Sequence, residues 1–131
     1  MYVTIGMQGE CSETVNEQNI ARRYGSGGLE VYATPAMIAL MEGAAVAAVE
    51  SQLPEGFSTV GTVVNIKHIA PTSTGATVHA HATLTAIDGR RLIFHVDASD
   101  NNGIIGEGTH ERFIVDNVKF VEKARNRSKA I

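Results

Sequence analysis

The chain has 131 residues, a formal net charge of −3 and 44% hydrophobic residues, which suits one domain with a real core. The mild negative charge argues against a nucleic-acid partner, and no stretch approaches the roughly 20 apolar residues of a membrane span. The single Cys11 excludes an internal disulfide and belongs to no zinc motif. The first ten residues, MYVTIGMQGE, lack the basic start and apolar run of a secretory signal. We therefore expect one cytoplasmic domain over 1–131, ending in a flexible basic tail at 122–131, with no bound metal.

The N-terminal part of the chain has only weak structural signals. Residues 2–7 and 11–15 predict at most one strand. Residues 16–28, NEQNIARRYGSGG, are polar and then glycine-rich, which favours a mobile loop with one helical turn. The first well-defined element is therefore expected after this loop.

A long helix is predicted from Thr34 to about Gln52. Thr34 precedes Pro35, and this pair is typical of a helix start, because a threonine hydroxyl caps free backbone N–H groups and proline fits the first turn. Pro54 and Gly56 then end the helix. Its apolar residues point in nearly every direction around the axis, as in a helix enclosed by other structure. They are Met37, Ile38, Leu40, Met41, Ala44, Ala45, Val46, Ala48 and Val49.

Glu42 interrupts this apolar helix at mid-length. A carboxylate is rarely buried without a partner, because leaving water costs several kcal/mol. A single glutamate in such a helix is more often the partner of an arginine or lysine than a catalyst. The residues alone therefore leave two explanations for Glu42, an ion pair and a reaction that needs a carboxylate.

Strands are predicted for the rest of the chain, at 57–69, 76–86, 90–99 and 104–121, the last with a break near Asp116. In the second strand, apolar residues from Val78 to Ala86 alternate with threonines and histidines, so that one face packs on the helix. An antiparallel sheet after one long buried helix is an α+β arrangement.

The hairpin near Gly89 decides which residues of the second and third strands are opposite each other. A two-residue loop at Asp88-Gly89 pairs Leu84 with Ile93 and mismatches the two apolar faces. A three-residue loop at 87–89, with Gly89 in the left-handed conformation, pairs Leu84 with Leu92. We expect the three-residue loop.

One helix wrapped by a curved antiparallel sheet is the hotdog fold, and four segments resemble one of its families. VYATPAMIALMEGA, VGTVVNIKHIAPTSTG, GRRLIFHV and GEGTHERFIV occur in this order over roughly residues 30–115. They resemble hotdog thioesterases of the fluoroacetyl-CoA thioesterase type. The resemblance implies an enzyme that hydrolyses a short acyl-CoA, with no cofactor because coenzyme A is part of the substrate. It also implies a homodimer or a dimer of dimers, with the acyl-pantetheine arm in the groove between subunits.

The resemblance also implies the site residues. Such enzymes use a threonine at the helix start, a glutamate two turns later and a histidine from the next strand, which match Thr34, Glu42 and His68. The family's glycine before that histidine matches Gly61, and the arginine of the GTHER stretch matches Arg112; both are expected at the substrate.

Helix geometry is compatible with this set. Thr34 and Glu42 are eight residues apart, so they lie on one stripe about 12 Å apart along the axis, and a third group must bridge them. Backbone N–H groups at the helix start stabilise negative charge on a thioester oxygen. Glu42 then acts as general base or as nucleophile, and His68 orients it, relays a proton or protonates the leaving thiolate. The sequence does not choose between these routes.

Several of these residues have simpler explanations. Thr34 is by default a helix cap, and His68 a surface or core histidine. Arg112 pairs with Glu42, lines the substrate channel or forms a surface ion pair. His79 and His81 have a spacing that suits a metal, but they lack a carboxylate partner and are expected at the surface.

Two other functions fit the same fold. A hotdog hydratase pairs aspartate and histidine in an Asp-x-x-x-x-His stretch, which this sequence lacks. A non-catalytic acyl-CoA or small-ligand binding domain is separated from an enzyme by hydrolysis assays. The identity of the acyl group stays open, because residues 24–28, YGSGG, are almost bare of the bulky apolar side chains that would form a lid. Arg90, Arg91 and the basic tail are candidates for the CoA nucleotide.

Overall fold

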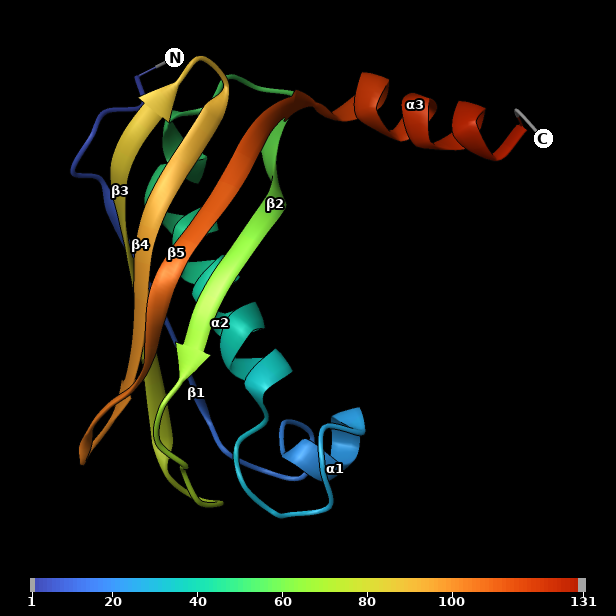
Figure 1. The fold of residues 1–131 in the computed structure, drawn as a ribbon. Coiled ribbons are helices and arrows are strands. Elements are labelled where there is room, and N and C mark those ends of the chain that lie inside the picture. The colour runs from blue at the N-terminus through green and yellow to red at the C-terminus, as the bar shows by residue number, and fades with distance from the viewer. Residues whose placement is uncertain (1, 130–131) are drawn as a thin grey trace.

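A curved antiparallel sheet of five strands covers one side of a long helix (Figure 1). The computed structural model describes residues 2–129. Its elements in chain order are β1 (Gln8–Thr14), α1 (Ala21–Tyr24), α2 (Thr34–Val49), the 3-10 turn η1 (Glu50–Gln52), β2 (Phe57–His68), β3 (Thr77–Asp88), β4 (Arg91–Asp100), β5 (Gly103–Asp116) and α3 (Asn117–Lys129). The strand order β1-β3-β4-β5-β2 makes β1 and β2 the two edges of the sheet. The α+β class, the long helix and the later strands are confirmed.

The two ends of the chain differ in how well they were predicted. β1 overlaps only the second of the two segments with weak strand signals, since it begins at Gln8 and residues 2–7 form no strand. α1 is the single turn expected inside the 16–28 loop. The last strand stops at Asp116, the expected break, but the residues after it are helical rather than extended. The segment expected to be a flexible tail is thus part of α3 as far as Lys129, and its last two residues lie outside the described part. The Asp116 side chain accepts a hydrogen bond from the backbone N–H of Lys119 at 3.2 Å, as a helix cap does.

The core lies between α2 and the inner face of the sheet. Alternate residues of β3 and β4 are fully buried, among them Leu84 and Phe94, and Met37 and Met41 of α2 are buried beside them. β1 approaches the helix most closely at Gly9, where an added Cβ atom lies 2.1 Å from the carbonyl oxygen of Ala44. Only glycine allows this contact. Across residues 2–129, no helix has the length and apolar character needed to cross a membrane.

The predicted register of the β3–β4 hairpin is wrong. Asp88 pairs with Arg91 across a loop of Gly89 and Arg90, and Gly89 has the expected positive φ of +61°. A β-bulge between Leu84 and Ala86 then shifts the register, so Leu84 pairs with Phe94 rather than with Leu92. With the two-residue loop alone, the buried residues of β3 would pair with outward-facing residues of β4. The bulge shifts the register by one residue, so that the buried residues of the two strands pair again. A bulge has no pattern of its own in an alternating strand.

The side of α2 away from the sheet is only partly covered within this chain. Ala39 and Ala47 are exposed, and Leu40 and Val46 are half-buried. The helix was predicted to be enclosed because its apolar residues point in all directions, but one sheet encloses only half of it. β2, the edge strand nearest this open side, exposes 42% of Val63 and 45% of Val64. An apolar helix face and an apolar edge strand thus remain uncovered.

Replacing Gly9 by Ala tests the close packing of β1 on α2. The added methyl group meets backbone atoms of Ala44 and Ala48, which cannot rotate away. We expect the free energy of unfolding to fall by at least the roughly 1–3 kcal/mol typical of overpacking, measured by denaturant titration. Gly28→Ala is the matched control, because nothing lies within 4 Å of its added Cβ atom. Equal stability of the two variants would contradict this packing.

Candidate active site

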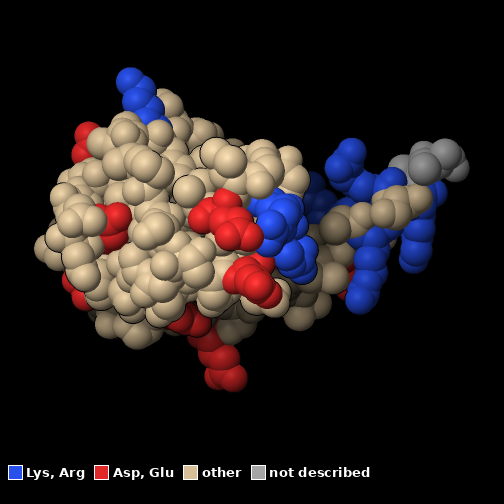
Figure 2. Space-filling model, turned by 90° about the horizontal axis from the view of Figure 1, so that it is seen from below, with Lys and Arg blue, Asp and Glu red and all other residues tan. Residues whose placement is uncertain are grey.

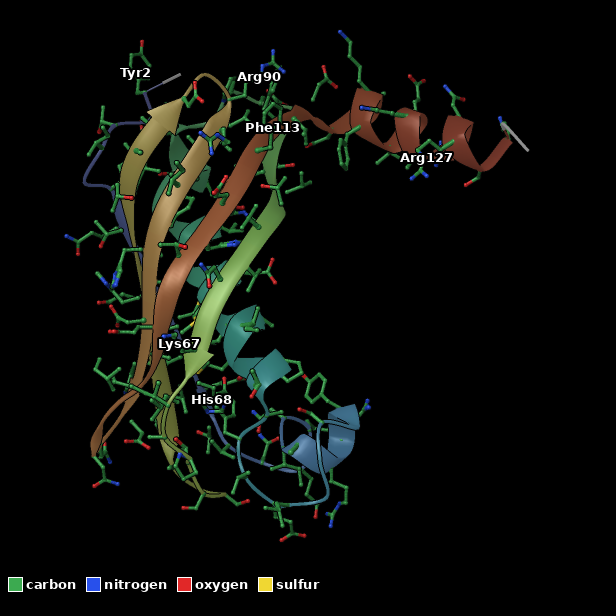
Figure 3. The ribbon with its side chains drawn as sticks, in the orientation of Figure 1. Tyr2, Lys67, His68, Arg90, Phe113 and Arg127 are labelled. Atoms are coloured by element: carbon green, nitrogen blue, oxygen red, sulfur yellow. The ribbon has the colours of Figure 1, made fainter. Side chains whose placement is uncertain are left out.

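Thr34 and His68 form one of two polar clusters. Thr34 is the first residue of α2, but Ala33 is the cap residue and no side chain caps the helix. The expectation that Thr34 is the cap is therefore wrong. Its Oγ1 atom lies 2.7 Å from Nδ1 of His68, the last residue of β2. Figure 3 shows His68 at the end of the strand that faces the start of α2. The hydroxyl thus serves the histidine rather than the helix backbone.

The second ring nitrogen of His68 is unusual. Within residues 2–129, Nε2 is shielded from solvent and has no hydrogen-bond partner. Burial lowers the pKa of His68, while the backbone of Ala70 acts in the opposite direction to a smaller extent. The imidazole is therefore neutral at pH 7. An unpaired, shielded nitrogen costs about 1–3 kcal/mol, as expected at a site that gains a partner on binding.

A cavity of about 290 Å³ opens beside this pair. Thr34 and His68 line it together with Tyr32, Ser26 and apolar residues such as Ile69. The Tyr32 hydroxyl donates a hydrogen bond to Glu13 at 2.5 Å, and burial together with this carboxylate raises its pKa. The tyrosine is thus a neutral wall of the cavity, and the Thr34–His68 pair lies beside it in the same lining.

Glu42 lies in a second cluster, centred on Arg112. The Arg112 Nη1 atom donates to Glu42 Oε2 at 3.3 Å, Nε donates to Thr59 Oγ1 at 2.8 Å and Nη2 donates to the Thr59 carbonyl at 2.9 Å. The Arg112 side chain is 8% exposed and that of Glu42 is 38% exposed. Burial lowers the pKa of Arg112, and Glu42 opposes this effect. Glu42 is therefore paired with Arg112, and its carboxylate still meets solvent.

Gly61 leaves room for this carboxylate. A Cβ atom at Gly61 lies 2.8 Å from Oε2 of Glu42 and 3.3 Å from Nη1 of Arg112. Any side chain here pushes the Glu42 carboxylate away from the β2 backbone. Gly61 also begins the irregularity of β2, because Thr62 is an extra residue between the pairs made by Gly61 and Val63. Gly61, Glu42 and Arg112, all predicted site residues, are thus in direct proximity.

His110 completes the second cluster and was missed as a functional residue by sequence reasoning. It is fully buried, and its Nδ1 atom lies 2.7 Å from the carbonyl oxygen of Val63. A carbonyl only accepts, so Nδ1 carries the proton and Nε2 is an acceptor. Nε2 lies 3.1 Å from Nη1 of Arg112 and 4.0 Å from Oε2 of Glu42. The neutral imidazole therefore fixes the arginine that holds the glutamate. The only sequence signal was its position on the same strand face as Arg112.

The two clusters do not touch within one chain. Thr34 and Glu42 are two turns apart on α2, about 12 Å along the axis. The hydrogen bonds and ion pairs of Glu42 in residues 2–129 go to Arg112 and His110, and none goes to His68. The predicted set is thus divided into Thr34–His68 and Glu42–Gly61–Arg112. Elsewhere, His79 and His81 lie on the outer, polar face of β3, and the described residues contain no group of His, Cys, Asp or Glu arranged for a metal.

Comparison with known proteins gives one family and several solved structures. The model of a family described as fluoroacetyl-CoA-specific thioesterase matches residues 15–118. A fluoroacetyl-CoA thioesterase from Streptantibioticus cattleyicolor is 42% identical over 101 residues, which make up 77% of this chain and 73% of the relative.

The solved structures share the whole architecture. The fluoroacetyl-CoA thioesterase FlK superposes with a TM-score of 0.89 at 34% identity, covering 96% of this chain and 98% of that chain. A hot-dog-like protein from Thermanaerovibrio acidaminovorans superposes with a TM-score of 0.85 at 24% identity, covering 94% of this chain and 91% of that chain. The predicted hotdog fold is therefore confirmed.

The burial of neutral His110 predicts how stability depends on pH. Burial and the Arg112 charge lower its pKa, while Val63, Glu42 and Glu111 act in the opposite direction. The unfolded chain therefore binds a proton near pH 6.5 that the folded chain still excludes, so stability falls as the pH drops below about 6.5. His68 adds to this effect in the same direction.

We expect melting temperatures between pH 8 and pH 5 to show this loss, and the loss to be smaller in His110→Gln. The glutamine oxygen replaces Nε2 as the acceptor for Arg112, but it does not titrate. His79→Gln is the control, because His79 is exposed on the outer face of β3. An equal pH dependence in the wild type and in both variants would refute the neutral, buried state of His110.

Proposed function

This chain belongs to the fluoroacetyl-CoA-specific thioesterase family, and we propose that it hydrolyses a short acyl-CoA thioester at a site containing Thr34, Glu42 and His68. The observation that carries the proposal is the position of the Glu42 carboxylate. Arg112 and the absence of a side chain at Gly61 hold it at a defined place on the sheet edge, with part of its surface open to solvent.

The reaction splits the bond between the acyl carbon and the sulfur of CoA by addition of water, and it releases a carboxylic acid and the CoA thiol. Glu42 either takes a proton from the attacking water or attacks the acyl carbon itself and forms an anhydride that water then cleaves. The start of α2 at Thr34 has unpaired backbone N–H groups, which stabilise negative charge on the thioester oxygen. Neutral His68, oriented by Thr34, relays a proton released from the attacking water to the leaving sulfur, which departs as the thiol.

The acyl group is proposed to lie in the cavity beside Thr34 and His68. About 290 Å³ is ample for a short acyl chain, and its wall includes apolar residues such as Val31 and Ile69. Residues 25–28 are three glycines and a serine, so no bulky side chain closes over the cavity. We therefore propose a range of short acyl groups rather than a single fluorinated one.

The proposed enzyme is a homodimer or a dimer of dimers. The open side of α2 and the edge strand β2 are apolar and adjacent, and an edge strand of twelve residues is a template for pairing with another strand. A second copy of β2, antiparallel to the first, continues the sheet and covers both surfaces. Such a two-fold contact is the commonest arrangement of identical subunits.

The same contact joins the two clusters. A two-fold axis near Val64 and Asn65, midway between Gly61 and His68, places His68 of one copy opposite Gly61 of the other. Glu42 of one copy then faces the Thr34–His68 pair of the second copy across the interface. The proposed site is therefore shared by two subunits, and a thioester between them bridges the groups that are apart in one chain.

The remaining expectations belong to the same proposal. The enzyme needs no cofactor, because the chemistry uses only side chains and water, and coenzyme A arrives with the substrate. We also propose a cytoplasmic location, in keeping with the free thiol of Cys11.

Replacing Glu42 by Gln tests the catalytic role against a purely structural one. The variant keeps an oxygen that accepts from Arg112, but it loses the base and the nucleophile. We expect hydrolysis of a panel of short acyl-CoAs to fall by about 10² or more. The melting temperature should change little, because the carboxylate is 38% exposed and the glutamine oxygen still accepts a hydrogen bond from the buried Arg112.

Glu55→Gln, which removes the same charge from an exposed turn, is the control for net charge. Near-full activity of the Glu42 variant together with a clearly lower melting temperature would show that Glu42 only balances Arg112. Absence of hydrolysis by the wild type over the whole panel would exclude the proposed function.

A shared site predicts that two inactive variants restore activity when mixed. In a mixed dimer of Glu42→Gln and His68→Ala, one site carries both replacements and the other carries none. Random exchange of subunits should therefore recover about one quarter of the wild-type rate, because half of the dimers are mixed and each has one intact site.

Each variant alone, and the two kept separate, serve as controls for residual activity. Dimers that exchange subunits, as followed by mass spectrometry, without recovery of activity would place each complete site within one chain. Elution of the wild type as a monomer at micromolar concentration would contradict the dimer itself.

A further inference from the structure

The C-terminal helix α3 has a charge unlike that of the rest of the protein. Its sequence NVKFVEKARNRSK contains five lysines and arginines against one glutamate, whereas the whole chain has a net charge of −3. All of its side chains are exposed, and the helix points away from the sheet (Figure 1). Figure 2 shows Lys and Arg side chains gathered on this projecting arm. Such a helix is suited to an anionic ligand.

A groove lies where α3 meets the sheet. It encloses about 180 Å³ and is lined by Arg90 from the β3–β4 hairpin, Phe113 from β5, and Lys119, Phe120 and Lys123 from α3. Phe113 and Phe120 are each 41% exposed, a large fraction for phenylalanine. Figure 3 shows Arg90 and Phe113 together at this junction, while Arg127 lies at the far end of α3. The groove thus combines two accessible aromatic rings with three cations.

Within residues 2–129, no carboxylate neutralises the three cations of the groove, although the Arg90 guanidinium lies over the Phe57 ring, 6.0 Å from its centre. Arg90, Lys119 and Lys123 form no ion pair with any of the residues 2–129. Arg91 differs, because it pairs with Asp88 and Glu111, which removes it from the candidates for the nucleotide. Asp116 is the one carboxylate in the lining, and it already accepts from the backbone of Lys119.

The groove lies at a suitable distance from Glu42. At the groove, Asp116 of β5 pairs with Phe57 of β2. Four residues further along the same two strands, Arg112 pairs with Gly61, beside Glu42. Four residues of strand span about 13 Å. The pantetheine arm of CoA has about as many backbone bonds as a four-residue peptide, so it also spans ~13 Å when extended. A thioester at Glu42 thus places its nucleotide at the groove.

A second hollow of about 220 Å³ is lined by residues that neighbour both places. It is lined by Thr59, which accepts from Arg112, by Asn117, the first residue of α3, and by apolar residues that include Val46, Leu53 and Phe57. An amphipathic arm with methyl groups and two amides suits such a lining.

We propose that this groove binds the phosphorylated adenosine end of the CoA substrate. The adenine ring stacks on Phe113 and Phe120, and Arg90, Lys119 and Lys123 contact the phosphates. This inference rests on the proposed acyl-CoA thioesterase function and assigns its nucleotide subsite. It also gives α3, which extends beyond the matched family region of residues 15–118, a role in substrate binding.

The experiment compares substrates with and without the nucleotide. Wild-type enzyme should have a lower KM for an acyl-CoA than for the matching acyl-pantetheine, which lacks the adenosine and its phosphates. Replacing Lys119 and Lys123 by Glu together should raise the KM for acyl-CoA about tenfold, because exposed charge contacts are individually modest, and bring it close to the KM for acyl-pantetheine. High salt should reduce the advantage of acyl-CoA in the wild type.

The control is the double replacement of Arg125 and Arg127 by Glu, which makes the same charge change on α3 outside the groove. We expect this variant to keep the wild-type KM for acyl-CoA. Equal KM values for the two substrates in the wild type, or equal effects of the two double variants, would overturn the nucleotide subsite while leaving the thioesterase function intact.

A binding measurement tests the groove without catalysis. Calorimetry should detect binding of adenosine 3′,5′-bisphosphate to the wild type and to the Arg125/Arg127 variant, but not to the Lys119/Lys123 variant. Lack of binding to the wild type would refute the subsite even if no substrate were hydrolysed. Far-UV circular dichroism of both double variants confirms that α3 is still folded.

Discussion

The buried guanidinium of Arg112 is the constraint around which the site is organised. A buried charge is tolerated only when its donors are paired, and the partners of Arg112 come from three elements: Thr59 on β2, His110 on its own strand β5, and Glu42 on α2. The planar fork of arginine fixes the relative positions of these partners. The edge strand, its neighbour and the helix are thus held in one arrangement by polar contacts, at the place where the hydrophobic core ends.

Two local irregularities make room for that arrangement. Gly61 removes the side chain that would occupy the position of the Glu42 carboxylate, and the extra residue Thr62 bends β2 directly after it. Both features weaken the strand, since glycine adds flexibility and a bulge interrupts the hydrogen-bond ladder. Bulges are common at sheet edges, but here the glycine lies directly beside the Glu42 carboxylate and the bulge follows it at once. Both features lie beside Glu42, the only carboxylate of α2. This indicates that β2 is irregular here because the irregularity holds the Glu42 carboxylate in a defined position.

Much of the fold could be predicted from the sequence, because helix and strand periodicities are local. Thr34 and Pro35 mark the start of α2, and the alternating residues of β3 and β4 mark the buried face. The bulge near Ala86 was missed because nothing local distinguishes it from a longer turn. The site residues were identified through family motifs, but the use of their polar atoms depends on tertiary contacts. The Thr34 hydroxyl, expected on the helix backbone, lies against His68, and His110 gains importance only from Val63 and Arg112.

The distribution of polar groups also supports the proposal that two copies share one site. The interior is a continuous apolar layer between α2 and the sheet, so polar chemistry must lie along its margin, at the edge strand β2 and the ends of α2. This edge of the apolar layer is open on one side. The Thr34–His68 pair and the Glu42–Arg112 pair lie at two separate places along it. In one chain, made of α2 packed on one sheet, a further strand or helix would be needed to bring these two pairs together. In the proposed dimer, β2 of a second copy is that element, and the two open edges together form an enclosed groove in which a thioester is shielded from bulk water.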